Sequence, residues 1–198
     1  MNVSRVAVLV LAVLQVVSPL VSQVVGADGF TVADRVGEPP IVPVGWAFSI
    51  WGLIELLSVA YAVWALRRPA DALLDELAKP LIVVFAGFSL WIVAASVEPV
   101  WTTVVVFLAM FAGLLWALRI ALAHRAEIAG WSRPGRALLW GTLGVYTGWT
   151  SIAVWVNLTT ALSASGAPIT GPVGVLGQAA VLAGATATAV AILRWTGG

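Results

Sequence analysis

The sequence predicts an all-α integral membrane protein, a single domain over residues 1–198 formed by a bundle of six transmembrane helices. The chain is 61% hydrophobic and only 10% charged, and its mean hydropathy is +1.03. Soluble domains are roughly 45–50% apolar and about 25% charged, so this composition excludes an ordinary soluble globule. The apolar residues gather into six blocks, each long enough to cross the roughly 30 Å hydrocarbon core as a helix.

The connections between these blocks contain residues that interrupt helices. Proline occurs in every one of them, and proline removes a backbone donor and ends or kinks a helix. Only the first connection, from Gly26 to Pro43, is long. The predicted spans are approximately residues 3–25, 44–66, 80–97, 100–123, 137–162 and 172–193.

Basic residues predict the orientation of these spans. With a cytoplasmic N-terminus, nine of the ten Lys and Arg residues fall on the inner side and only Arg35 falls on the outer side. Cytoplasmic segments of membrane proteins carry such an excess of positive charge. We therefore expect an integral protein of a bacterial cell membrane, surrounded by the lipid bilayer, with both termini cytoplasmic.

The first block has two interpretations. Arg5, the apolar run after it and the segment Val25-Gly26-Ala27 resemble a signal peptide with its cleavage site. The apolar run is near 20 residues, however, whereas the apolar region of a signal is about 7–15 residues long. Gln15, Ser18 and Ser22 also recur on one helix face, which favours a retained helix that packs inward.

The second block contains the most informative residue, a single carboxylate near the middle of the span. On a helix, Glu55 shares one stripe with Phe48, Trp51 and Ser58. Ionisable groups at this depth are rare, and they usually face a bundle interior or a cavity. We therefore take Glu55, Phe48 and Trp51 as candidate ligand-binding residues.

The fifth block carries a second polar and aromatic face. Tyr146, Trp149, Ala153 and Asn157 follow one another at helical spacing, and such a face is too polar for lipid contact. It is either a hydrogen-bonded packing seam or the wall of a ligand site.

In the last block, Ala180, Gly184 and Thr188 form a ridge of small residues, which is typical of a packing or dimer face.

Several function classes find no support in the residues. The chain has no cysteine and no basic patch with interleaved aromatic residues, so neither a thiolate site nor nucleic-acid binding is expected. We find no nucleophile elbow, metal pair, dinucleotide loop or phosphate loop. The only histidine, His124, lies at the end of the fourth block. We therefore expect no catalytic or metal-ligating residues, no required cofactor and, with the question left open, no enzyme activity.

Three segments together resemble a known family. The first loop leads into Gly45-Trp46-Ala47-Phe48-Ser49-Ile50-Trp51, the third block holds Leu90-Trp91, and the fifth reads Tyr146-Thr147-Gly148-Trp149-Thr150-Ser151-Ile152-Ala153-Val154-Trp155-Val156-Asn157. This pattern resembles the TspO/MBR family of tryptophan-rich sensory, or translocator, proteins. The resemblance covers the first five blocks. The sixth block is an addition to the family pattern.

The resemblance implies a fold and a ligand class. Family members are five-helix bundles, commonly homodimers, that bind tetrapyrroles such as protoporphyrin and, in animals, cholesterol and drugs. It implies that Trp51 and Trp149 are pocket aromatics, with Tyr146, Ala153 and Asn157 along the same wall, and we add Trp91 from the third block. The chain departs from the family where Glu38-Pro39-Pro40 lacks a preceding tryptophan and where Glu55 replaces a frequent tyrosine.

Three functions follow as hypotheses. The first is a membrane-embedded binding or sensory protein, a receptor with an aromatic pocket for a hydrophobic small molecule such as a tetrapyrrole or a lipid. The second is a proton-coupled carrier in which Glu55 exchanges a proton during transport. The third is an accessory subunit of a larger membrane complex that docks through the last helix. We favour the binding protein, because the resemblance and the aromatic stripes point to one site.

Overall fold

A computed structural model describes residues 2–24, 38–95 and 100–197, and within these ranges the regular structure is entirely helical, as predicted. Most of the long first connection, including Arg35 and Val25-Gly26-Ala27, lies outside the described residues. The helices are α1 (Val3–Val24), the short 3-10 helix η2 (Gly45–Ser49), α2 (Ile50–Leu66), α3 (Ala72–Ala95), α4 (Trp101–Ala123), α5 (Arg125–Ala129), α6 (Arg133–Ala164) and α7 (Gly171–Thr196).

Five of the described helical segments are long and apolar enough to cross a membrane: α1, η2 with α2, α3, α4 and α7. The helix α6 has 32 residues, which is more than a span needs. Its threonines, serines, tyrosine and asparagine lower its hydropathy, so it does not reach the apolarity of the other five. Its place in the bundle is instead evident from its packing.

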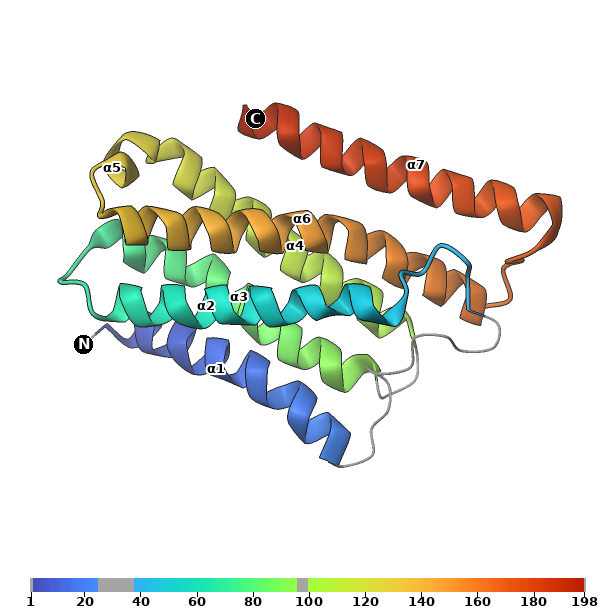
Figure 1. Cartoon of the computed structure of the whole chain (residues 1–198), viewed down its shortest axis with the longest axis horizontal. Helices are drawn as coiled ribbons and strands as arrows, with labels where there is room; N and C mark the ends of the chain where they lie inside the picture. The colour runs from blue at the N-terminus through green and yellow to red at the C-terminus, as the bar shows by residue number, and fades with distance from the viewer. Residues whose placement is uncertain (1, 25–37, 96–99, 198) are drawn as a thin grey trace.

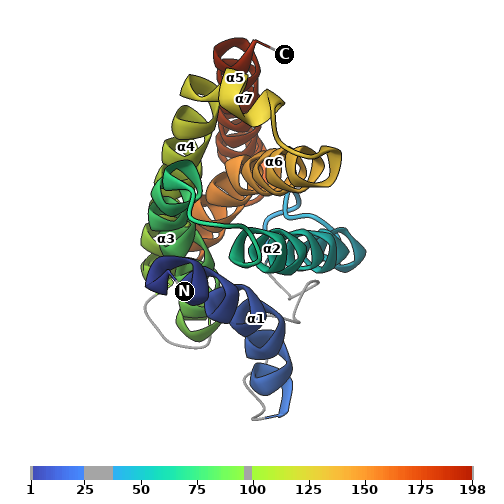
Figure 2. The same ribbon diagram turned by 90° about the vertical axis from the view of Figure 1, so that its left-hand side faces the viewer.

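Five long helices form a closed ring (Figures 1 and 2). Around the ring, α1 packs on α2, α2 on α6, α6 on α4, α4 on α3, and α3 on α1. The helix α7 lies outside the ring and packs mainly on α6. Each of these helices pairs its backbone donors and acceptors internally except at its two ends, which the hydrocarbon core requires.

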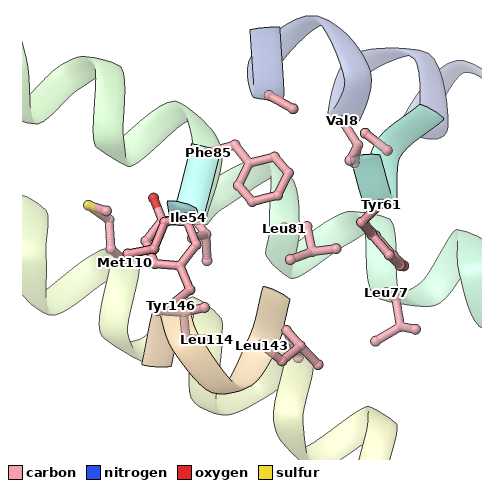
Figure 3. Packing of buried hydrophobic residues seen from close by; sticks show 14 of the residues in the cluster. Val8, Ile54, Tyr61, Leu77, Leu81, Phe85, Met110, Leu114, Leu143 and Tyr146 are labelled. Carbon is pink, nitrogen blue, oxygen red and sulfur yellow. The ribbon is translucent and has the colours of Figure 1, made fainter. Parts of the chain in front are cut away.

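Large side chains from all parts of the ring fill its centre (Figure 3). Phe85 of α3 stacks on Tyr146 of α6 with ring centroids 6.2 Å apart, and Ile54 and Met110 lie beside them and are fully buried. Tyr146 also donates a hydrogen bond of 2.9 Å to the side-chain oxygen of Gln15. The polar stripe of α1 thus faces inward, as predicted.

Two helix starts differ from the sequence prediction. The helix α3 begins at Ala72, whereas the span was placed from Pro80. The amphipathic turns before Pro80 join the helix because Leu73, Leu74 and Leu77 are buried, and the proline removes only one backbone donor. The helix α6 starts at Arg133, where the Ser132 hydroxyl accepts a hydrogen bond of 3.4 Å from the Gly135 amide and caps the first turn.

A buried arginine fastens α1 to the connection between α2 and α3. The side chain of Arg5 is 4% exposed and forms an ion pair with Asp75 at 2.5 Å. The same guanidinium donates to four backbone carbonyls at the C-terminal end of α2 and the start of α3. Those acceptors are the carbonyls of Ala65, Arg68, Pro69 and Asp71. The first block is therefore part of the bundle core.

The small-residue ridge of α7 packs within the chain. Thr188 accepts a hydrogen bond of 3.1 Å from the indole nitrogen of Trp155 on α6. A side chain at Gly184 would overlap the Trp155 ring. The ridge was predicted to be a packing face or a dimer face. In the structure it packs on α6 of the same chain, because the Trp155 ring occupies the space that the glycine leaves free.

Candidate functional site

The candidate site forms where the first turn of α2 meets α3, α4 and α6. The chain enters through Pro43 and the 3-10 turn η2, in which Ala47 donates to the Val44 carbonyl at 2.9 Å. Phe48 lies in this turn and so is not on the α-helical stripe that the sequence predicted. Trp51 follows in α2 and is 3% exposed. The tighter turn places both rings at the same end of the bundle.

Trp51 is the centre of an aromatic cluster. Its ring meets Phe88 at 4.8 Å and Tyr146 at 5.8 Å between centroids, both edge to face, an arrangement that adds to simple burial. Phe48 in turn meets Trp149 edge to face at 5.9 Å. The other rings around Trp51 are those of Trp91 at 5.6 Å, Trp149 at 6.1 Å and Phe107 at 6.3 Å.

The cluster surrounds a small cavity of about 20 Å³. A space of this size holds about one water molecule. The structure therefore shows the site closed, with its volume taken by the side chains themselves. The cavity is lined by Pro43, Phe48, Trp51, Trp91, Phe107, Trp149, Ile152, Ala153, Val156 and Asn157.

Two buried indole donors give the site a polar character. The side-chain nitrogens of Trp51 and Trp149 are both buried and have no hydrogen-bond partner among the described residues. Buried polar groups are nearly always paired, and buried tryptophan nitrogens usually find an acceptor. The amide of Asn157 donates to the Ala153 carbonyl at 2.9 Å. Two residues of the cavity lining thus each carry an indole N–H whose hydrogen-bonding capacity is unused among the described residues.

Six of the eight predicted site residues line the cavity: Phe48, Trp51, Trp91, Trp149, Ala153 and Asn157. Tyr146 packs against Trp51 but does not line the cavity. It is fully buried, and its hydroxyl donates to the Gln15 side chain. Glu55, one helical turn after Trp51, is only partly buried and is not among the lining residues. The arrangement brings the aromatic residues together and leaves the carboxylate outside the cavity.

Four lining residues were absent from the predicted site: Pro43, Phe107, Ile152 and Val156. Ile152 and Val156 lie three and seven positions after Trp149 on α6, so the helical period could have indicated them. The period gives no such signal for Phe107, which reaches the site only because α4 packs between α3 and α6.

Comparison with known proteins agrees with this architecture. A search of curated proteins and a search of solved structures found no match. A family model described as TSPO-like protein matches residues 2–197, nearly the whole chain including α7. The chain therefore belongs to the TspO/MBR family, as a TSPO-like protein.

Proposed function

We propose that this protein binds a flat, hydrophobic small molecule that carries an acceptor group, at the cluster around Trp51. The observation that carries the proposal is that Trp51 and Trp149 both line an aromatic cavity and both have a buried indole nitrogen without a hydrogen-bond partner among the described residues. Aromatic walls with a few well-placed polar groups are typical of small-molecule sites. A tetrapyrrole carboxylate, or the carbonyl or hydroxyl oxygen of a lipid, supplies such an acceptor.

Binding requires the closed cavity to open. About 20 Å³ cannot hold a tetrapyrrole, so ring side chains must move apart. The 3-10 turn η2 is the element best suited to move, because none of its residues is buried and it contributes only Phe48 to the cluster. A ligand that binds the open form would shift the population towards it. Such a shift is the basis we propose for a sensory role.

The proposal predicts a specific effect of Trp149. Trp149→Ala should weaken ligand binding by about 1–3 kcal/mol, because it removes one aromatic wall and one buried donor. The measurement is a fluorescence and absorbance titration with protoporphyrin, haem and a panel of isoprenoid and sterol lipids. Trp46→Ala is the matched control, since Trp46 is 79% exposed and lies outside the cavity lining. Equal binding by both variants and the parent would place the site elsewhere.

The position of Glu55 separates binding from proton-coupled transport. Since Glu55 does not line the cavity, Glu55→Gln should leave the same titrations unchanged. A carrier that uses this carboxylate would instead lose coupled transport in the glutamine variant, which cannot release a proton.

We further propose that both termini face the cytoplasm of a bacterial cell. The helix ends that carry the nine basic residues outside the first loop lie at one end of the bundle (Figure 1). Because the chain has no cysteine of its own, Ala129→Cys and Thr170→Cys can each be labelled alone. An impermeant thiol reagent added to intact cells should label Thr170→Cys only, and labelling of Ala129→Cys only would reverse the orientation. The homodimer and the porphyrin ligand that the family resemblance implies stay predictions.

A further inference from the structure

The outer helix α7 leaves a second, larger space on the opposite side of α6 from the ring centre. The C-terminal half of α7, together with α4 and α6, surrounds an open groove with a cavity volume of about 610 Å³. We call it the α7 groove. None of the residues that line the aromatic cavity contributes to it except Ile152. Apart from Gly174, the helix α7 has no buried residue among those described.

Two glycines of α6, Gly144 and Gly148, form the floor of the α7 groove. A side-chain Cβ placed at either position would meet no atom within 4 Å, so the groove is open above them. Between them lies Thr147, 2% exposed, whose hydroxyl has no hydrogen-bond partner among the described residues. Apolar walls come from residues such as Leu118, Leu122 and Leu193. The groove thus suits a long apolar occupant that carries an oxygen able to accept a hydrogen bond from the Thr147 hydroxyl.

The end of the groove near the C-terminus of α7 is cationic. Arg125 lines it and donates one hydrogen bond of 3.1 Å to the Thr196 carbonyl, with its side chain exposed. On the other side of α7, a neighbouring groove of about 670 Å³ carries Arg119 beside Trp116 and Trp195. Among the described residues, no acidic side chain lines either groove. Arginine and tryptophan at this position are typical of the membrane interface.

We propose that the α7 groove binds an anionic glycerophospholipid of the adjoining leaflet. One acyl chain lies over Gly144 and Gly148 against the apolar walls, and the headgroup phosphate meets Arg125, whose guanidinium fork matches phosphate geometry. The positive end of the groove favours an anionic headgroup over a zwitterionic one. The lipid then fills the space that α7 leaves against α4 and α6, so α7 docks partly through it.

Native mass spectrometry of the purified full-length protein tests this proposal. Detergent-solubilised protein is titrated with phosphatidylglycerol and, separately, with phosphatidylcholine of the same acyl chains. We expect phosphatidylglycerol to be retained more tightly, by about fivefold for each arginine that meets the phosphate. Equal retention of the two lipids would overturn the assignment of the charged end.

Two variants locate the bound lipid. A side-chain Cβ at Gly148 would meet no atom within 4 Å, so Gly148→Leu should fold as the parent does, occupy the floor of the groove and lose the retained phosphatidylglycerol. Arg125→Gln should reduce the preference for phosphatidylglycerol about fivefold while retaining an amide that can still donate to the Thr196 carbonyl. Gly177→Leu, on α7 outside the groove and equally open, should change neither. If Gly148→Leu keeps the lipid, or instead separates a dimer, the floor is not a lipid site.

Discussion

Arg5→Met is expected to lower the free energy of unfolding by about 3 kcal/mol. The guanidinium is buried and is shared between Asp75 and four carbonyls. Without it, the end of α2 loses a strong donor and Asp75 loses its charged partner. Asp75 is 34% exposed, so water can hydrate its carboxylate, and we place the effect at the low end for a broken buried pair.

Unfolding in increasing dodecyl sulfate, followed by circular dichroism, measures this loss. Arg67→Met is the matched control, because Arg67 lies at the same end of α2 and is exposed. Exposed substitutions of this kind usually change stability by less than about 0.5 kcal/mol. A similar loss in both variants would mean that charge at this end, rather than the buried network, stabilises the fold.

Trp51→Ala is expected to cost about 3–5 kcal/mol of stability, the range for truncating a buried aromatic side chain. Five rings surround Trp51 and cannot all close over the space that it leaves. In a membrane the loss is mainly of packing contacts, since lipid is as apolar as the core.

The same unfolding assay tests this prediction with two companions. Trp51→Phe keeps a ring in the cluster and removes an indole nitrogen that has no partner in the part of the chain that the structure describes, so its cost should be much smaller than that of alanine. Trp46→Ala removes an indole that is 79% exposed and should leave stability nearly unchanged. If Trp51→Ala unfolds as the parent does, the cluster is loosely packed and the closed cavity is not a stable state.

The aromatic cluster and the Arg5 network lie at opposite ends of the bundle. The cluster around Trp51 lies at the end where α2 begins and α6 ends, whereas the Arg5 network lies where α2 ends and α3 begins. The Arg5 network joins α1, α2 and α3 at one end, and the proposed opening of the site would take place at the other end, at η2.

Patterns in the sequence predict the helices and many of the residues that line the candidate site. Long apolar runs predict membrane helices, because backbone groups in lipid must be paired within a helix. Helical spacing on α6 brought Trp149, Ala153 and Asn157 to one face, and the structure places all three on the cavity. These features depend on residues close in the chain, so a periodic pattern can indicate them.

Which helix faces contact one another becomes evident from the folded bundle and not from these patterns. Phe48 and Glu55 share a stripe with Trp51 on a continuous helix, but in the structure Phe48 lies in a 3-10 turn and still lines the cavity, whereas Glu55 is not among the lining residues. In the sequence, Arg5 served as an orientation signal and as part of a possible signal peptide; in the structure its side chain binds the junction of α2 and α3, 60 to 70 positions away. The small-residue ridge packs at Gly184 against Trp155 of the same chain. Such contacts depend on how helices distant in sequence pack together, which local periodicity does not encode.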